Sequence, residues 1–131
     1  MKKGAIFLIL LYCACNVKGS DHIRKDGYNI RDFGAVSDGK TINTKFIQMA
    51  IDKCFADGGG EVIIPNGVFR TGTVYLKHNV AIYLDPSAVL NGSTDKNDYA
   101  DSALIVALEQ NNIGVYGRGT INSCLLLVIC C

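Results

Sequence analysis

Two short segments of the chain repeat the same pattern of residue types. Residues 79–83 and 112–116 each have asparagine, a branched apolar residue, a small residue, a branched apolar residue and tyrosine, at an offset of 33 residues. A second pair, residues 89–91 and 120–122, repeats two residues out of that register. Repetition at a nearly fixed period is typical of solenoids, in which each coil buries its apolar face on the next. The alternation of strand side chains then predicts which residues point inward, namely Val80, Ile82, Ile113 and Val115, and which point outward, namely Tyr83 and Tyr116.

Short β-strands are predicted throughout the second half of the chain. From Glu61 onward, apolar residues recur with a period of two and are separated by Gly, Pro and Asn turns at residues 65–67, 85–86 and 91–92. The predicted strands are residues 61–65, 73–77, 79–84, 87–92, 103–108 and 112–117. An earlier short strand, at residues 28–30, precedes a loop punctuated by glycine. This spacing is compatible with a sandwich, a barrel or a solenoid, and the repeat favours the solenoid.

One helix is predicted, at residues 43–55. Its apolar residues Ile47, Ala50, Ile51 and Cys54 follow helical spacing. Asn43 can cap its first turn and Gly58 can supply a left-handed stop. We expect Cys54 to be a small buried apolar residue. In a solenoid, the apolar face of this helix would cover the open end of the first coil.

The N-terminus has the layout of a secretory signal peptide at residues 1–20. Two lysines precede an apolar run at residues 5–12, which is shorter than the about 20 residues that a membrane span needs. Cleavage before Cys15 would make this cysteine the lipid anchor of a lipoprotein, although Tyr12 fits that signal poorly. Cleavage after Gly19 or Ser20 would release a soluble product. A buried N-terminal helix is the third reading, and residues 21–27 are expected to be a linker.

Charge and cysteine content exclude several classes of protein. The chain has 13 Lys and Arg residues against 12 Asp and Glu, and no basic stripe indicates a nucleic acid partner. Its 6 cysteines make neither a disulfide framework nor a zinc site by their spacing. No motif indicates a cofactor or a metal.

From Tyr28 to Asn122 the sequence resembles glycoside hydrolase family 28, the polygalacturonase-like pectin hydrolases. The opening "DFGAVSDGKTINT" is shared with many right-handed parallel β-helix proteins, including phage tailspikes. The continuation "GGGEVIIPNGVFRTGTVYLKHNVAIYLDPSAVLNGSTD" and the later "GRGTI" are more specific to the hydrolases. The resemblance implies an all-β fold, a right-handed parallel β-helix of the pectin-lyase type, and a pectic polysaccharide (galacturonan) as partner.

The resemblance also implies where the chemistry lies. Enzymes of this family carry Asn-x-Asp, Asp-Asp, Gly-His-Gly and Arg-x-Lys segments in later coils, and none of these occurs here. We therefore expect no catalytic residue before Cys131, an N-terminal fragment that is inactive alone, and a truncated or aberrant tail at residues 123–131. The full-length protein is expected to be a monomer that is secreted, periplasmic or an outer-surface lipoprotein. The alternative is a non-catalytic β-helix module that binds glycans or resembles a tailspike.

Three aspartates form the densest acidic cluster of the sequence. Asp95, Asp98 and Asp101 lie in a loop with Ser, Thr and Asn, where aspartate commonly bonds its own backbone. A calcium loop would need glycine at the position of Ala100. A structural role is therefore expected for this cluster.

Structural roles are also expected for the remaining polar candidates. Asp32 and Asp38 flank a Gly-rich loop and are read as turn residues, and His78 is read as a surface residue. Three cations could meet an acidic sugar, because basic side chains pair with carboxylates, although solvation is the simpler reading. They are Arg70, Lys77 and Arg118.

Overall fold

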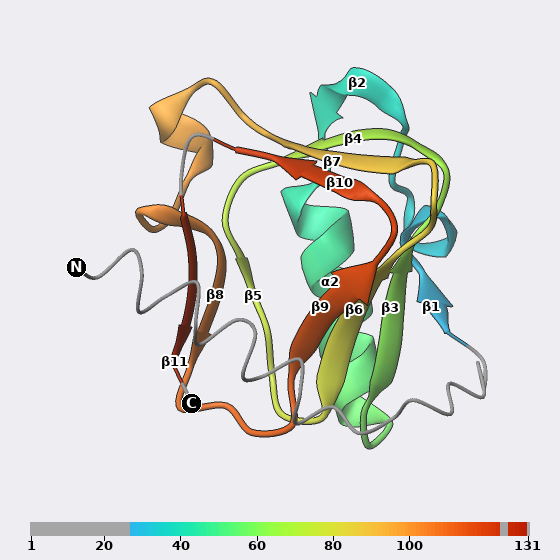
Figure 1. The fold of residues 1–131 in the computed structure, drawn as a ribbon, viewed down its shortest axis with the longest axis vertical. Helices are drawn as coiled ribbons and strands as arrows, with labels where there is room; N and C mark the ends of the chain where they lie inside the picture. The colour runs from blue at the N-terminus through green and yellow to red at the C-terminus, as the bar shows by residue number, and fades with distance from the viewer. Residues whose placement is uncertain (1–26, 124–125, 131) are drawn as a thin grey trace.

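The strands of this protein form three parallel sheets, and the chain passes from one sheet to the next in each coil (Figure 1). The computed structural model describes residues 27–123 and the backbone of residues 126–130. Sheet A has the order β1-β3-β6-β9, sheet B the order β10-β7-β4-β2, and sheet C the order β11-β8-β5. The fold is therefore the parallel β-helix that the repeat predicted.

The coils are built from short strands with tight corners. Sheet A contains β1 (Tyr28–Asn29), β3 (Gly60–Ile64), β6 (Val80–Leu84) and β9 (Gly114–Gly117). Sheet B contains β2 (Asp38–Ile42), β4 (Gly67–Thr71), β7 (Ala88–Gly92) and β10 (Thr120–Asn122). Sheet C contains β5 (Val74–Tyr75), β8 (Ala103–Leu108) and β11 (Leu126–Cys130). The helices are η1 (Ile30–Phe33), α2 (Thr44–Ala56) and η2 (Lys96–Asp98).

The sequence repeat corresponds to neighbouring coils. Tyr83 pairs with Tyr116 in parallel register, and their rings meet edge to face with centroids 5.5 Å apart. Asn112 donates a side-chain hydrogen bond of 3.1 Å to Asn79, 33 residues earlier. Both asparagines have positive φ angles, 64° for Asn79 and 57° for Asn112, in the left-handed region that asparagine tolerates better than most residues. The repeat therefore marks one turn of the solenoid.

Apolar stacks along the solenoid axis form the core. Register alignment places Val62, Ile82 and Val115 above one another in sheet A, with Val62 and Ile82 fully buried. In sheet B, Phe69 and Leu90 are fully buried and Ile121 packs against them in the same row. Each coil thus buries its inward row on the next.

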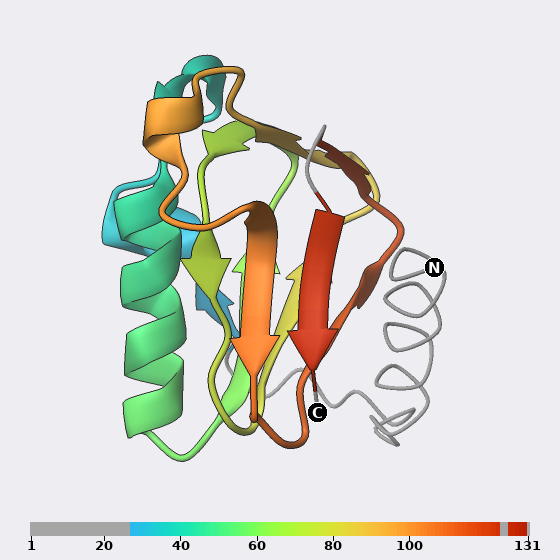
Figure 2. The same cartoon turned by 90° about the vertical axis from the view of Figure 1, so that its left-hand side faces the viewer.

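Helix α2 closes the N-terminal end of this core, as predicted. Figure 2 shows α2 at one end of the stack of coils and β11 at the other. Its residues Ile47, Ala50, Ile51 and Cys54 are all fully buried. Gly58, with a φ angle of 101°, supplies the left-handed turn that follows the helix. No helix formed by the described residues is long and apolar enough to cross a membrane.

The predicted role of Asn43 as a side-chain cap is wrong. Its side chain makes no capping hydrogen bond to α2. It instead accepts a bond of 2.9 Å from the Val36 N–H and donates to the carbonyl oxygens of Val36 and Thr41. The fully buried Asn43 side chain therefore satisfies backbone groups of the loop before the helix. These bonds occupy the side-chain amide, so it is not available to cap α2.

Several other boundaries differ from the sequence predictions. The expected glycine-punctuated loop contains η1 and β2, and β4 was missed because its polar residues and Gly67 mask the alternation. Part of the expected aberrant tail forms β11, which pairs in parallel with β8. The signal peptide at residues 1–20, Cys15, and residues 21–26 of the linker lie outside the described residues and stay predictions.

Candidate functional site

A cleft of about 580 Å³ follows the ends of β4, β7 and β10 in sheet B. Backbone and small side chains form much of its wall, which leaves room for a ligand ring. The lining residues are Gly39, Arg70, Asn91, Gly92, Ser93, Thr94, Ile121, Asn122 and Ser123. Arg70 is the charged residue of this set, and none of the lining residues carries a carboxylate.

Three of these side chains form a row across successive coils, which we call the polar rung: Arg70, Asn91 and Asn122. Parallel pairing aligns Arg70 with Asn91 and Asn91 with Asn122. Asn122 donates a hydrogen bond of 3.1 Å from its amide to Asn91 Oδ1. Strands lie about 4.8 Å apart, so the rung places one polar side chain per coil along the solenoid axis.

The guanidinium group of Arg70 is held at the edge of the cleft. Arg70 alternates along β4 with the buried Phe69 and Thr71, so its side chain points away from the core. Its Nη2 donates a hydrogen bond of 2.6 Å to Thr94 Oγ1. A guanidinium group has five N–H donors, so this bond leaves capacity for a planar carboxylate.

The acidic cluster is structural, in agreement with the prediction. Asp95 accepts a hydrogen bond from the Asn97 N–H at 2.9 Å and caps η2. Asp98 accepts a hydrogen bond from the hydroxyl of Ser93, and Asp101 accepts one of 2.9 Å from the Ser102 N–H. No group of three or more His, Cys, Asp or Glu residues in the described part of the chain could hold a metal ion.

The loop that contains these aspartates, residues 93–102, is anchored beside the cleft. Tyr99 donates a hydrogen bond of 2.7 Å from its hydroxyl to the carbonyl oxygen of Ser93. A second cavity of about 510 Å³ lies within the loop and is lined by Lys96, Tyr99, Ala100, Asp101 and Ser102. Of the residues that line these two cavities, Asp101 is the one with a carboxylate.

Asp38 is a turn residue, as predicted. Its carboxylate accepts bonds from the Lys40 N–H at 2.8 Å, and from the N–H and the hydroxyl of Thr41, each at 2.7 Å. These bonds, led by the one from the Thr41 backbone, lower the pKa of Asp38 to about 2. Asp32 lies exposed in η1 and lines neither cavity.

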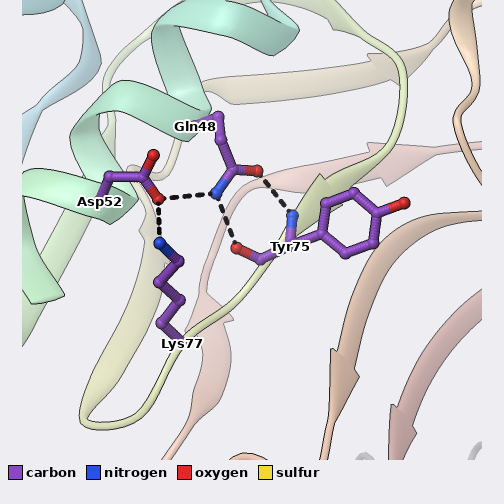
Figure 3. Close-up of polar contacts among 4 residues, drawn as sticks. All are labelled: Gln48, Asp52, Tyr75 and Lys77. Atoms are coloured by element: carbon purple, nitrogen blue, oxygen red, sulfur yellow. Dashed lines mark hydrogen bonds and ion pairs between the residues drawn. The ribbon is translucent and has the colours of Figure 1, made fainter.

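The three candidate cations are not brought together. Lys77 forms an ion pair of 2.8 Å with Asp52 of α2 (Figure 3). Its ammonium group also lies over the ring of Phe55. Arg118 is exposed in the turn between β9 and β10. Arg70 is therefore the one of the three that lines the sheet B cleft.

His78 and Cys54 also have structural contacts. The half-buried His78 accepts a hydrogen bond of 2.9 Å at Nδ1 from the Asn111 N–H and so ties two coils together. Burial, followed by the charges of Asp57 and Glu61, raises the pKa of the Cys54 thiol to about 11. The thiol is therefore protonated at neutral pH, consistent with the predicted packing role.

The residues that line the sheet B cleft carry groups that can donate hydrogen bonds to an anion. The cleft offers a guanidinium group, two amides and several hydroxyls, which suit an acidic sugar. Sequence reasoning named Arg70 as one of three possible contacts to an acidic sugar but favoured solvation, and it did not propose Asn91 or Asn122 as contacts. The repeat between residues 89–91 and 120–122 is a sequence signal for this pair, because Asn91 and Asn122 occupy the same position in the two segments.

The three sheets wound from parallel strands define the class of this protein as the right-handed β-helix of the pectin-lyase type. No family model matches the chain. The exo-poly-alpha-D-galacturonosidase of Dickeya chrysanthemi is 35% identical over 115 residues, which covers 72% of this chain. Alginate lyase 7 of Azotobacter vinelandii is 44% identical over 63 residues, which covers 42% of the chain.

Two solved structures are similar along most of the chain. A candidate glycosyl hydrolase from Parabacteroides merdae superposes with a TM-score of 0.70 at 41% identity, covering 73% of this chain and 43% of that one. The family 28 exopolygalacturonase of Yersinia enterocolitica superposes with a TM-score of 0.64 at 37% identity, covering 72% of this chain and 20% of the enzyme. The chain is therefore a relative of the family 28 polygalacturonases.

The chain is short relative to these proteins. It spans 19% of the length of the Dickeya galacturonosidase and 7% of that of alginate lyase 7. The similarity thus covers a minor part of each of these relatives, and the activity of the longer proteins does not follow from it directly.

Proposed function

We propose that this chain supplies the first coils of a polygalacturonase-like glycoside hydrolase that acts on pectic polysaccharide. The observation that supports the proposal is the shared sequence and fold with the Dickeya galacturonosidase and the Yersinia exopolygalacturonase. In the family that it resembles, the reaction is the hydrolysis of α-linked galacturonic acid with inversion of configuration at the anomeric carbon. We further propose that the chain alone is inactive and that further coils would have to supply the reacting carboxylates.

The chemistry explains the proposed inactivity. Inverting hydrolysis needs one carboxylic acid to protonate the leaving oxygen and one carboxylate to activate water, held about 6.5–9.5 Å apart. Asp95 and Asp98 bond their own loop, and the cleft of sheet B is lined by no carboxylate. These groups therefore provide no acid and base that face each other across a bound sugar.

A reducing-sugar assay on polygalacturonate tests this proposal. Purified residues 21–131 should release no reducing ends, and a double Asp95→Asn, Asp98→Asn variant is the matched control. Turnover that disappears in the double variant would instead place an active site in residues 95–98. A second test is to read the DNA downstream in all three frames, where Asp-Asp and Gly-His-Gly coils should follow.

Within such an enzyme, we assign the sheet B cleft to binding an acidic polysaccharide. Arg70 would pair with a sugar carboxylate, and the amides of Asn91 and Asn122 would bond sugar hydroxyls. Arg70→Ala should weaken binding of galacturonate oligomers several-fold, whereas Arg118→Ala, which removes an exposed cation outside the cleft, should not. Titration calorimetry measures both, and equal affinities would remove Arg70 from the proposed site.

A non-catalytic glycan-binding or tailspike-like module is the second candidate. The cleft favours it, because a wall that offers a cation and amides without a carboxylate is suited to binding rather than hydrolysis. Unrelated sequence downstream of the gene would support this module. If the first candidate is right, we expect the full-length hydrolase to be a monomer.

Export is also a proposal. The signal-like residues 1–20 support secretion or a periplasmic location, and Cys15 supports an outer-surface lipoprotein. Labelling of expressing cells with radioactive palmitate separates the two. Label on the wild type and none on Cys15→Ser would support the anchor, and an unlabelled protein cleaved after Gly19 or Ser20 would support soluble export.

A further inference from the structure

Among the residues that the structure describes, sheet C has no strand in the first coil, where sheets A and B have β1 and β2. The chain forms α2 at this point instead, so β5 is the N-terminal edge of sheet C. An edge strand exposes backbone N–H and C=O groups that can pair with another chain. We propose that a polar stripe on α2, formed by Thr44, Gln48 and Asp52, takes the place of the missing strand and closes this edge to a second copy of the chain.

The contacts of Gln48 imitate those of a neighbouring strand. Gln48 Oε1 accepts a hydrogen bond of 2.8 Å from the Tyr75 N–H, and its Nε2 donates one of 3.0 Å to the Tyr75 carbonyl oxygen (Figure 3). A primary amide has the same donor and acceptor as a peptide group. One side chain therefore satisfies both backbone groups of Tyr75.

Leu76, which directly follows β5, shows that the backbone groups of Tyr75 face the open edge of the sheet. The Leu76 N–H donates a hydrogen bond of 2.8 Å to the Val106 carbonyl oxygen of β8. Consecutive residues of a strand direct their backbone groups to opposite sides. The Tyr75 groups thus point away from β8, toward the side on which a fourth strand would lie.

Thr44 and Asp52 extend the same replacement along the edge. Thr44 Oγ1 accepts a hydrogen bond of 2.6 Å from the Gly72 N–H, just before β5. Asp52 pairs with Lys77 just after it, and also accepts a bond of 3.1 Å from Gln48 Nε2. The stripe therefore holds the edge from residue 72 to residue 77.

The spacing of the stripe explains how a helix can match a strand. Thr44, Gln48 and Asp52 are separated by four residues each, which puts them on one face of α2. Four residues of α-helix rise about 6 Å, and two residues of strand advance about 6.6 Å. Gln48 and Asp52 can therefore meet Tyr75 and Lys77 at successive outward positions of the edge.

Amide hydrogen exchange on the full wild-type chain is the first test. Although β5 is an edge strand, the Tyr75 amide should exchange as slowly as the Leu76 amide, which bonds to β8 and serves as the internal reference. Exchange of Tyr75 more than tenfold faster than that of Leu76 would show that Gln48 does not close the edge. This measurement depends on no variant folding.

A Gln48→Ala variant is the second test. Protection of the Tyr75 amide should fall at least tenfold while that of Leu76 is kept, and sedimentation should show self-association that increases with concentration. Met49→Ala, at an exposed position of the same helix, is the matched control and should behave as wild type. A folded Gln48→Ala variant with wild-type protection at Tyr75, or one that self-associates no more than the wild type, would overturn the proposal.

Discussion

At the scale of single residues, the hydrogen bonds to Asp38 stabilise its ionised carboxylate. The stability of this turn should therefore depend on pH. The pKa of Asp38 is lowered to about 2 by its bonds to Thr41 and Lys40. A depressed pKa means that the ionised carboxylate stabilises the fold above the unfolded pKa, and that this contribution is lost as pH falls through the folded pKa. The relevant window therefore lies between about pH 4 and pH 2.

We expect Asp38→Asn to flatten the pH dependence of stability in this window. The asparagine keeps one acceptor for the turn but does not titrate, so the free energy of unfolding should fall less steeply below pH 4 than in the wild type. Urea unfolding at several pH values measures this slope. Asp32→Asn removes a charge from the same region and is the control, and an identical slope for Asp38→Asn and wild type would contradict the expectation.

The left-handed residue Asn112 offers a second test at this scale. Asn112→Ala should lower the free energy of unfolding by about 1 kcal/mol more than Asn112→Gly, because alanine is strained at the φ angle of 57°. Both variants lose the bond to Asn79, so their difference isolates the backbone. Thermal unfolding compares them, and equal stabilities would show that the turn relaxes to another conformation.

At the scale of elements, α2 has two faces with different roles. Its apolar face covers the core, and its polar stripe of Thr44, Gln48 and Asp52 meets the edge of sheet C. The apolar face was predictable, because spacing alone shows which residues are buried. The polar stripe was not, since its partners are backbone groups far along the sequence, and nothing local marks them.

Ile51→Asp tests the apolar face of α2. Ile51 is fully buried, so the variant would bury an unpaired charge and should lose more than about 3 kcal/mol of unfolding free energy. Met49→Asp is the matched control, because Met49 is 46% exposed on the same helix and should change stability by no more than about 0.5 kcal/mol. An Ile51→Asp variant that melts like wild type would place this face in solvent.

The same contrast explains how much of the fold and site could be predicted. The repeat at Tyr83 and Tyr116 fixed the parallel register, because identical positions in neighbouring coils stack directly. β4 and β2 escaped prediction, since Arg70, Gly67 and the Asp38 turn interrupt the apolar alternation. The sequence offered Arg70 only as one of three cations for which solvation was favoured, and the register of β4 and β7 is what places it beside Asn91.

At the scale of the whole molecule, the length of a coil varies at one corner. Residues 72–73 join sheet B to sheet C in one coil, whereas residues 93–102 make the same connection in the next. Strand register in sheets A and B is kept through both coils. The longer connection carries η2 and lines the second cavity.

We expect insertions at these two connections to have opposite effects. Two extra residues after Ala100, which is exposed, should leave the melting temperature within a few degrees of wild type. The same insertion after Gly72 should unfold the chain or lower its stability strongly, because a Cβ at Gly72 would already collide with the carbonyl oxygen of Asp98. Circular dichroism melts compare the two, and equal tolerance would show that the short connection is not constrained.

The variable corner has an evolutionary consequence. Stacking in the three sheets requires constant strand positions, but the connection at residues 93–102 changes length outside that constraint. New side chains can therefore be added next to the sheet B cleft without rebuilding the core. The chain aligns both with an exo-poly-alpha-D-galacturonosidase and with an alginate lyase, whose names denote different reactions. In a solenoid of this kind, the connection at one corner can change in length and sequence from coil to coil while the stacked strands keep their positions.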